Sequence, residues 1–507
     1  MREEKDQEAP TTSQPRQTPE IPKTTKEAKP LEPQEPRRST RIGRDKRPFN
    51  QREKEGLYGP PQINKIRSIV NRAGHDSDHP TEEQANSSPN AREWEEAREK
   101  ERQKLRKYGV YSIVPKIPDR HKAVDTKWVY DVKRDAQGNL LRRRARKVGR
   151  GFTQEYGKTY EETYSQMARS ETWRILLTLA VQNKWHVRQW DVVAAYLNAP
   201  LNHEVYVQDT NEQGKKEYWR LHKALYGLKQ AGHEWYNTLR SIMTKSGLRQ
   251  CIGDPGVFKT EGPDFAIIAT HVDDMPIFAP KEDTLGEIES AIEQHVELEK
   301  LGVPAKLLGM ELSWGSNHEW VKLTQKSAID NLTKEYGTTT MIPTKSLPVN
   351  SNDYAETQEQ TTPELLKKYQ SLVGSLLYIA RHTRPEITLH TNLLGRRTSN
   401  AMPNNLKTGL QVLKYLASSS EDGVKLKGNL GQTSEKPITI KGYADASYGG
   451  EKVRSQSGSL VTLNEQATIW TSRRQDTVAQ SITEAEYIAY SKTAKDLRWI
   501  TQFLEEV

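Results

Sequence analysis

The fold is decided by the stretch FAIIATHVDDMPIFA, residues 265–279. Two apolar runs flank the adjacent acids Asp273 and Asp274, which predicts a β-hairpin with two carboxylates at its tip. Ordinary turns also use Asp, so this pair alone is a weak signal of function. Pro276 has no backbone N–H to donate, and we therefore expect the second strand to be a sheet edge or to contain a bulge.

A third acid follows a strand earlier in the chain. Residues 186–190, HVRQW, predict a strand that leads into Asp191, and apolar residues follow it. Because a carboxylate among apolar neighbours is costly without a partner, Asp191 either caps the next helix or serves the chemistry. Three carboxylates can bind two divalent ions about 3.5–4 Å apart, as in two-metal phosphoryl transfer. A strand-borne Asp, a helix and an Asp-Asp hairpin are the arrangement of a polymerase palm.

A cationic hairpin is predicted upstream of these acids, after a helix-forming stretch at residues 91–108. Residues 127–132 and 140–148 predict two strands joined by a turn at 135–139. The second strand carries five cations: Arg142, Arg143, Arg144, Arg146 and Lys147. Charged edge strands discourage pairing with other chains, but five cations also suit a finger that faces phosphates.

Length and composition limit the alternatives. A chain of 507 residues suits three or four domains of roughly 100–200 residues. Lys and Arg number 76 and Asp and Glu 67, and the net charge of +9 favours polyanionic partners, nucleic acid above all. The single cysteine, Cys251, excludes an internal disulfide and a cysteine-built zinc site.

The first 90 residues predict a disordered tail, because they are rich in proline and polar residues and hold almost nothing that could form a core. Within the tail, RRSTRIGR (37–44) is a basic cluster that suits a nuclear-import signal, a nucleic-acid-binding arm or a solvated linker. The N-terminus has no apolar signal segment, and no stretch approaches the roughly 20 apolar residues that span a bilayer. We expect a cytoplasmic or nuclear protein that is neither secreted nor membrane-bound.

Four phrases carry a resemblance to a known family. They are RKVGRGFTQ (146–154), QWDVVAAYLN (189–198), LHKALYGLKQA (221–231) and HVDD (271–274). In this order and spacing, they make residues 127–330 resemble the reverse transcriptase of copia-type LTR retrotransposons. The chain as a whole resembles a fragment of their Pol polyprotein. The resemblance implies an enzyme, an RNA-directed DNA polymerase that uses an RNA template, a DNA primer–template hybrid and dNTPs, and that acts in cytoplasmic virus-like particles, the nucleus or both.

The resemblance also implies roles for individual residues. Asp191, Asp273 and Asp274 would hold two Mg²⁺ ions, or Mn²⁺ in their place, as the catalytic and metal-binding carboxylates. The nucleotide would be contacted by Arg146, assisted by Arg144 or Arg150, and by Tyr196, Tyr226 and Gly227. Tyr196 would lie beneath the sugar and exclude a 2′-hydroxyl, unless it serves only core packing.

Some positions depart from the family pattern. His271 stands where the family usually has Tyr, and Gly232-His233 where a Pro-Arg pair is common. Neither departure removes a metal ligand, but His271 would alter the surface beside the primer terminus.

The C-terminal segment resembles the start of a retrotransposon ribonuclease H domain. ITIKGYADAS (438–447) and ITEAEYIA (482–489) supply Asp445 and Glu486 as the first two of its four acids. The third and fourth acids do not follow, so we expect no RNA cleavage by this chain alone. We also expect the strand around Tyr443 to be unpaired on one side, where a second copy or another polypeptide would complete the domain.

The expected fold is therefore α+β and multidomain. The domains are a disordered tail (1–90), polymerase fingers, palm and thumb (91–345), a linker and helical connection (346–435) and a truncated ribonuclease H-like domain (436–507). The alternative function is a non-catalytic nucleic-acid-binding remnant of a decayed retroelement.

Overall fold

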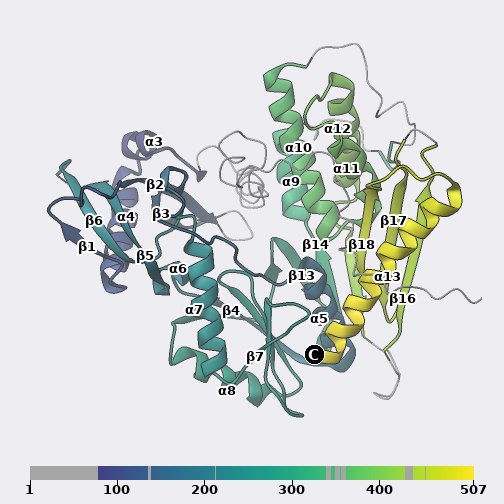
Figure 1. Cartoon of the computed structure of the whole chain (residues 1–507), viewed down its shortest axis with the longest axis horizontal. Helices are drawn as coiled ribbons and strands as arrows, with labels where there is room; N and C mark the ends of the chain where they lie inside the picture. Colours follow the sequence, from purple (N-terminus) through teal and green to yellow (C-terminus); the bar gives the residue numbers. More distant parts are fainter. Residues whose placement is uncertain are drawn as a thin grey trace, which may run out of the picture. The chain divides into compact units, whose positions relative to one another are not determined.

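The structure is a computed structural model that describes residues 78–134, 139–211, 213–337, 344–348, 354, 361–428, 438–450 and 453–507. The chain divides into two units, residues 1–59 and 60–507, and all described residues lie in the second. They form mixed α and β structure, as expected, and their strands make four sheets (Figure 1). The basic cluster at 37–44 and most of the turn at 135–139 lie outside the described residues. None of the helices in the described ranges is both long and apolar enough to cross a membrane.

The expected boundary of the disordered tail at residue 90 is wrong, because folded structure begins earlier. Helix α3 (Glu82–Ser87) starts with a capping box, in which Thr81 and Gln84 each accept a hydrogen bond from the other's backbone N–H. Ala85 of this helix is fully buried. A capping box satisfies two backbone N–H groups that the start of a helix otherwise leaves without an acceptor. The overall composition of residues 1–90 does not reveal such a local motif.

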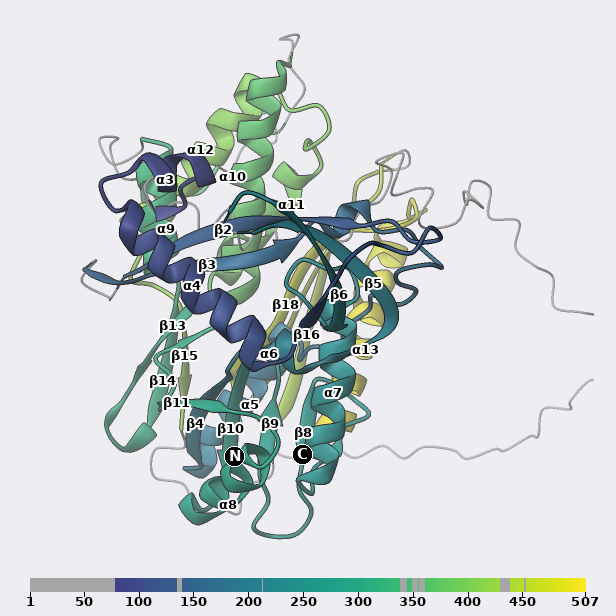
Figure 2. The ribbon, with the colours of Figure 1, turned by 90° about the vertical axis from the view of Figure 1, so that its left-hand side faces the viewer.

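The first sheet carries the cationic hairpin. Its strand order is β1-β6-β5-β2-β3, with β1 (Tyr111–Val114), β2 (Val124–Arg134), β3 (Leu140–Gly149), β5 (Pro200–Thr210) and β6 (Lys216–Lys223). Strands β2 and β3 pair antiparallel, which confirms the predicted hairpin. Helix α4 (Ala91–Lys107) packs against β3, and Figure 2 shows it in purple beside these strands. A short 3₁₀ turn, η3 (Gly151–Thr153), follows β3.

The second sheet carries the acids. Its order is β11-β4-β10-β9-β8-β7, with β4 (His186–Val192), β7 (Arg249–Gln250), β8 (Val257–Lys259), β9 (Ile267–Ala269), β10 (Asp274–Ala279) and β11 (Leu298–Gly302). The short helix α6 (Ala195–Asn198) follows β4. Alternate residues of β10 enter two different apolar clusters: Ile277 packs with α7 (Ala231–Lys245) and α8 (Glu282–Glu293), and Phe278 with α5 (Ser170–Asn183). The sheet is therefore buried on both faces.

The position of β10 corrects the expectation for Pro276. This strand pairs with β4 on one side and β9 on the other, so it is not an edge strand. Its pairing with β9 involves only Ile277 and Phe278. Pro276 precedes that ladder, where a missing backbone donor costs little.

A third sheet and a group of helices follow. The sheet is β12 (Lys306–Leu307), β13 (Met310–Trp314), β14 (Trp320–Thr324) and β15 (Val424–Lys427), with the 3₁₀ turn η4 (Ser316–His318) between β13 and β14. The helices α9 (Lys326–Glu335), α10 (Pro363–His382), α11 (Thr388–Gly395) and α12 (Pro403–Ser418) share one apolar cluster, and η7 (Pro385–Ile387) connects two of them. Both the sheet and the apolar cluster contain residues from before and after residue 345, where the sequence predicts a domain boundary.

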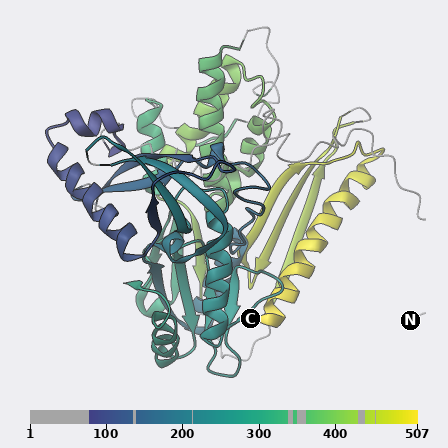
Figure 3. The ribbon, with the colours of Figure 1, turned by 60° about the vertical axis from the view of Figure 1, so that its left-hand side comes forward.

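The fourth sheet is antiparallel, with order β16-β17-β18. Its strands are β16 (Ile440–Ser447), β17 (Gln456–Leu463) and β18 (Gln466–Arg474), and α13 (Ile482–Glu506) packs along them (Figure 3). Gly442 of β16 lies directly against Thr493 and Leu497 of the helix, where a Cβ would collide with both. Among the described residues β16 pairs only with β17, which confirms the unpaired side predicted at Tyr443.

Candidate active site

Strand pairing brings two of the three predicted acids face to face. Asp191 near the end of β4 lies opposite Asp274 at the start of β10. On its other side, Asp191 lies opposite Glu299 of β11. Because directly opposite residues of antiparallel strands have neighbouring Cβ atoms, these side chains share one small region. Asp191 does not cap the next helix, since the N-cap of α6 is Ala194.

The third acid lies in the tight turn that joins β9 to β10. His271 and Asp274 form the base of this turn, and their backbones exchange hydrogen bonds of 2.9 and 3.2 Å. The carbonyl of Asp273 accepts a hydrogen bond from the N–H of Val192, at 3.0 Å. The turn is thus tied to the end of β4, directly beside Asp191.

The carboxylates repel one another. The pKa of Asp191 is raised to about 7, first by burial and then by the charges of Asp273, Asp274 and Glu299, while Arg144 counteracts the rise. Gln189 donates a hydrogen bond of 3.3 Å to the carboxylate of Asp274. A cation bound among these groups would relieve the repulsion that raises the Asp191 pKa.

The donor set suits a hard divalent cation. In the part of the chain that the structure describes, no group of three or more His, Cys, Asp or Glu side chains is arranged to hold one ion. Mg²⁺ needs only one or two carboxylates per ion and completes its coordination with water and substrate phosphates. The all-oxygen donors of Asp191, Asp273 and Asp274 are therefore of the kind that Mg²⁺ prefers.

Of the three predicted arginines, Arg144 acts on Asp191, and Arg146 lies over Tyr226, a ring that also feels the charge of Asp273. Arg146 of β3 stands over the ring of Tyr226, with its guanidinium carbon 5.6 Å from the ring centroid. Burial and the nearby Arg146 lower the pKa of Arg144, which is also close enough to act on Asp191. Arg150 instead lies over the ring of Phe152, and its backbone N–H donates to the carbonyl of Asp125.

The aromatic residues and the glycine predicted to contact nucleotide form a wall next to these arginines. The rings of Tyr196 and Tyr226 meet edge to face, with centroids 5.8 Å apart. The carbonyl of Tyr226 accepts a hydrogen bond of 2.8 Å from the N–H of Gly149, at the end of β3. Gly227 has a φ of +86°, and a Cβ there would lie 2.4 Å from the carbonyl oxygen of Gly149. The glycine therefore permits the close approach that places Tyr226 beside Arg146.

Three residues of this region have no counterpart in the sequence-based prediction. They are Glu101 of α4, Glu299 of β11 and Trp235 of α7. Glu101 is 5% exposed; burial raises its pKa, and Lys104, Arg144 and Arg146 oppose the rise. A signal for it exists, because Glu101 falls on the same helix face as the buried Trp94, Ala97 and Leu105. Trp235 likewise lies on the apolar face of α7 with Ala231 and Leu239, but its contact with Val272 has no local signal. Glu299 reaches Asp191 only through strand pairing.

The two predicted C-terminal acids lie on neighbouring elements, Asp445 on β16 and Glu486 on α13. The N–H of Ala446, next to Asp445, donates a hydrogen bond of 3.2 Å to the carboxylate of Glu486. Glu484 lies apart and accepts instead from the N–H of Gln480 at the helix start.

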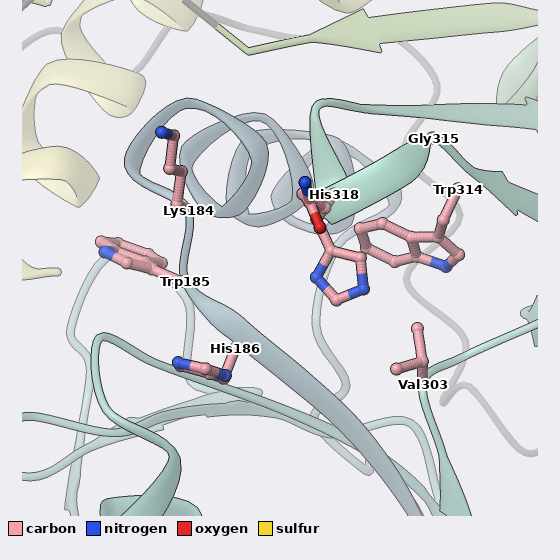
Figure 4. Close-up of a pocket in the computed structure, with 8 residues that line it drawn as sticks. Lys184, Trp185, His186, Val303, Trp314, Gly315 and His318 are labelled. Atoms are coloured by element: carbon pink, nitrogen blue, oxygen red, sulfur yellow. The ribbon is translucent and has the colours of Figure 1, made fainter.

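A separate cavity of about 600 Å³ lies at the opposite end of β4 from Asp191. Its lining residues are Lys184, Trp185, His186, Val303, Trp314, Gly315, Asn317 and His318. Figure 4 shows the rings of Trp314 and His318 together, with the segment from Lys184 to His186 across from them. None of the predicted site residues lines this cavity.

Comparisons with known proteins show what the chain is similar to. The family described as "Reverse transcriptase (RNA-dependent DNA polymerase)" matches residues 108–351. The chain is 29% identical over 434 residues to the "Retrovirus-related Pol polyprotein from transposon TNT 1-94" of Nicotiana tabacum, a match that covers 83% of this chain and 32% of the relative. It is 30% identical over 412 residues to the corresponding polyprotein from transposon RE1 of Arabidopsis thaliana, with 78% and 27% covered.

The chain thus spans about a third or less of the length of these two relatives. A solved structure of a foamy viral protease-reverse transcriptase in complex with double-stranded DNA is 12% identical, with a TM-score of 0.41, and the match covers 78% of this chain and 58% of that one. Residues 108–351 thus match the reverse transcriptase family, and the chain as a whole is similar to parts of the Pol polyproteins of copia-type retrotransposons.

Proposed function

We propose that residues 91–345 catalyse RNA-directed DNA synthesis, in which nucleotides from dNTPs are added to a DNA primer on an RNA template. The six-stranded sheet is then the palm, the five-stranded sheet with α4 the fingers, and the segment through α9 leads into the thumb. One observation carries the proposal: the register of β4 and β10 sets Asp274 opposite Asp191, with Asp273 in the adjoining turn.

In this reaction the primer 3′-oxygen attacks the α-phosphorus of the dNTP, and pyrophosphate leaves. Asp191, Asp273 and Asp274 would hold the Mg²⁺ or Mn²⁺ ions, which when bound activate the attacking hydroxyl and stabilise charge on the phosphate oxygens. Their placement at one end of a doubly buried sheet supports this role, since the rigid strands fix the spacing of the carboxylates.

The arginines and tyrosines would bind the nucleotide. Arg146 and Arg144 would form charge-assisted hydrogen bonds to the triphosphate, since both lie near the carboxylates, and Arg150 would join them only by turning away from Phe152. Tyr196 would lie beneath the sugar and reject a 2′-hydroxyl by its bulk. Tyr226 and Gly227 would line the pocket of the new base pair. Other cationic side chains would hold the template–primer through its phosphates, so binding should weaken as salt rises.

The C-terminal part would serve as a ribonuclease H-like module, joined to the polymerase by the helical connection at 346–435. The hydrogen bond from the N–H of Ala446 to Glu486, which ties the strand of Asp445 to α13, supports this assignment. The unpaired side of β16 would accept a strand from a second copy or another polypeptide. Action in cytoplasmic particles, in the nucleus or in both is part of the same proposal.

Primer extension by the full chain tests the polymerase function. With Mg²⁺, the wild type should extend a DNA primer on an RNA template, and Asp273→Asn should abolish extension, because the amide keeps the shape but loses the charge. Asp283→Asn, on the exposed first turn of α8, is the matched control and should extend normally. Extension by Asp273→Asn at the wild-type rate would refute the assignment of the hairpin.

The same preparation separates the polymerase from a non-catalytic nucleic-acid-binding remnant. Filter binding with the RNA–DNA primer–template measures affinity independently of synthesis. A remnant would bind this duplex yet never extend the primer, whereas the proposed polymerase does both.

A further inference from the structure

The turn that carries Asp273 has an unusual backbone conformation. It is a two-residue hairpin loop, Val272 and Asp273, between the paired residues His271 and Asp274. Val272 has a φ of +63°, and Asp273 is not among the residues with positive φ. Positive φ at only the first of two loop residues is the pattern of a type II′ turn, in which glycine is strongly preferred.

Valine at this position is strained. A β-branched side chain at positive φ is an outlier, since its Cβ substituents crowd the backbone. Such a conformation persists only where the surroundings hold it in place, and residues of this kind cluster at functional sites. The strained residue here directly precedes a carboxylate assigned to catalysis.

A buried side chain holds the strained residue from outside the hairpin. The indole N–H of Trp235 donates a hydrogen bond of 2.6 Å to the carbonyl oxygen of Val272. Trp235 lies on α7, is 2% exposed and belongs to the apolar cluster against which Val272 packs. Helix α7 thus fixes one carbonyl of the turn, while Val192 of β4 fixes the next, that of Asp273.

We propose that Trp235 is a positioning residue of the polymerase, whose indole N–H keeps the Val272–Asp273 turn in the strained conformation that presents Asp273 beside Asp191. This inference rests on the proposed function, since it assigns Trp235 a share in that chemistry. Without the hydrogen bond the turn would relax toward negative φ at Val272, and the Asp273 carboxylate would leave its place.

The test compares two tryptophan-to-phenylalanine substitutions in the full chain. Trp235→Phe removes the N–H but keeps an aromatic ring in the cluster. Trp173→Phe is the matched control, because Trp173 of α5 is 0% exposed and its indole nitrogen has no hydrogen-bond partner among the described residues. We expect Trp235→Phe to lower kcat about tenfold, the effect of one lost buried hydrogen bond, with the KM for dNTP nearly unchanged. Trp173→Phe should leave kcat at the wild-type value.

A rescue variant separates positioning from general destabilisation. Glycine adopts positive φ without strain, so adding Val272→Gly to Trp235→Phe should restore most of the lost kcat. A merely structural role for Trp235 would predict no rescue, because glycine removes further packing. The proposal is overturned if Trp235→Phe has the kcat of Trp173→Phe, or if Val272→Gly does not rescue it.

Hydrogen exchange measures the same effect without activity. The N–H of Val192 donates to the carbonyl of Asp273, so loosening of the turn should speed its exchange in Trp235→Phe and not in Trp173→Phe. If the wild type failed to extend primers, the polymerase proposal would fail on its own, and the exchange rates would still decide whether Trp235 holds the turn. Equal exchange in both variants would show that it does not.

Discussion

Individual side chains at the site are fixed by different means. Asp191 and Asp274 lie on paired strands inside a sheet, so the backbone ladder sets their positions. Asp273 lies in a loop of two residues and depends on hydrogen bonds from Val192 and, through Val272, from Trp235. We therefore expect Asp273 to be the acid whose position is most sensitive to changes outside the sheet.

Tyr196 makes a separate prediction at this scale, which concerns selection of the sugar. The ring of Tyr196 packs edge to face against Tyr226, which holds it in place. In the proposed function, this ring lies against the 2′-position of the nucleotide. Tyr196→Val should lower the preference for dNTPs over rNTPs by about tenfold or more, measured as the ratio of kcat/KM values. Tyr196→Phe keeps the ring and should keep the preference. If the Tyr196→Val variant still rejects rNTPs, Tyr196 serves only core packing.

Helices and strands differ in how well the sequence predicts them. The cationic hairpin, the helix at 91–108 and the strand before Asp191 are confirmed, because each has a clear local pattern of alternation or helix-forming residues. The early helix α3 was not expected, since its capping box lies in a polar, proline-rich context. The edge strand or bulge expected at Pro276 is absent from β10, because strand order and register depend on the whole sheet.

The candidate site also contains some residues that the sequence predicts and others that it does not. The sequence supplied the three acids through two strand-and-acid patterns and a family resemblance, and the structure brings them together. It could not supply Glu299, which meets Asp191 only through the pairing of β11 with β4. Trp235 was equally hidden, because its contact with Val272 spans 37 residues and joins a helix to a turn. Contacts of this kind follow from packing and leave no local periodicity.

At the element scale, the end of α13 predicts a stability effect. The Glu506 carboxylate accepts hydrogen bonds from the N–H groups of Ile252 at 3.2 Å and Gly253 at 2.9 Å, which lie between β7 and β8. Glu506→Ala should lower the free energy of unfolding by about 1–3 kcal/mol, since two backbone donors lose a charged acceptor. Thermal unfolding measures the loss, and the exposed Glu505→Ala serves as control. Equal melting temperatures for the two variants would contradict this reading.

At the scale of the described chain, one buried arginine joins α5 to α10 and to the fourth sheet. Arg174 of α5 is 1% exposed, donates to the carbonyls of Thr468 (2.7 Å) and Arg381 (3.1 Å), and stands 3.9 Å over the ring of Trp470. The same apolar cluster includes residues of the second, third and fourth sheets. We therefore expect these parts to unfold together.

His382 at this junction predicts how stability depends on pH. Burial, with Arg174 and Arg381 nearby, lowers its pKa to about 4, while the Tyr378 carbonyl and Glu171 act in the opposite direction. In the unfolded chain His382 has an ordinary histidine pKa of about 6.5, so it binds a proton more readily there than in the folded chain. The contribution of neutral His382 to the free energy of unfolding is therefore fully present above about pH 6.5. The free energy of unfolding falls by up to about 3 kcal/mol as the pH drops toward 4.

Denaturant unfolding between pH 4 and 7 checks this prediction. His382→Gln should flatten the slope, because the amide has no proton to gain. His295→Gln, at an exposed histidine of the same chain, should retain the wild-type slope. Parallel pH profiles for the wild type and His382→Gln would refute the role of His382.

The central claim is that Asp191, Asp273 and Asp274 together bind the ions of a nucleotidyl transfer. Anomalous diffraction from the full chain with an RNA template, a DNA primer, a dNTP and Mn²⁺ tests it most directly. Two manganese peaks should appear about 3.5–4 Å apart, in contact with these three carboxylates and the triphosphate. Manganese bound elsewhere, or a triphosphate seated away from the three acids, would contradict it.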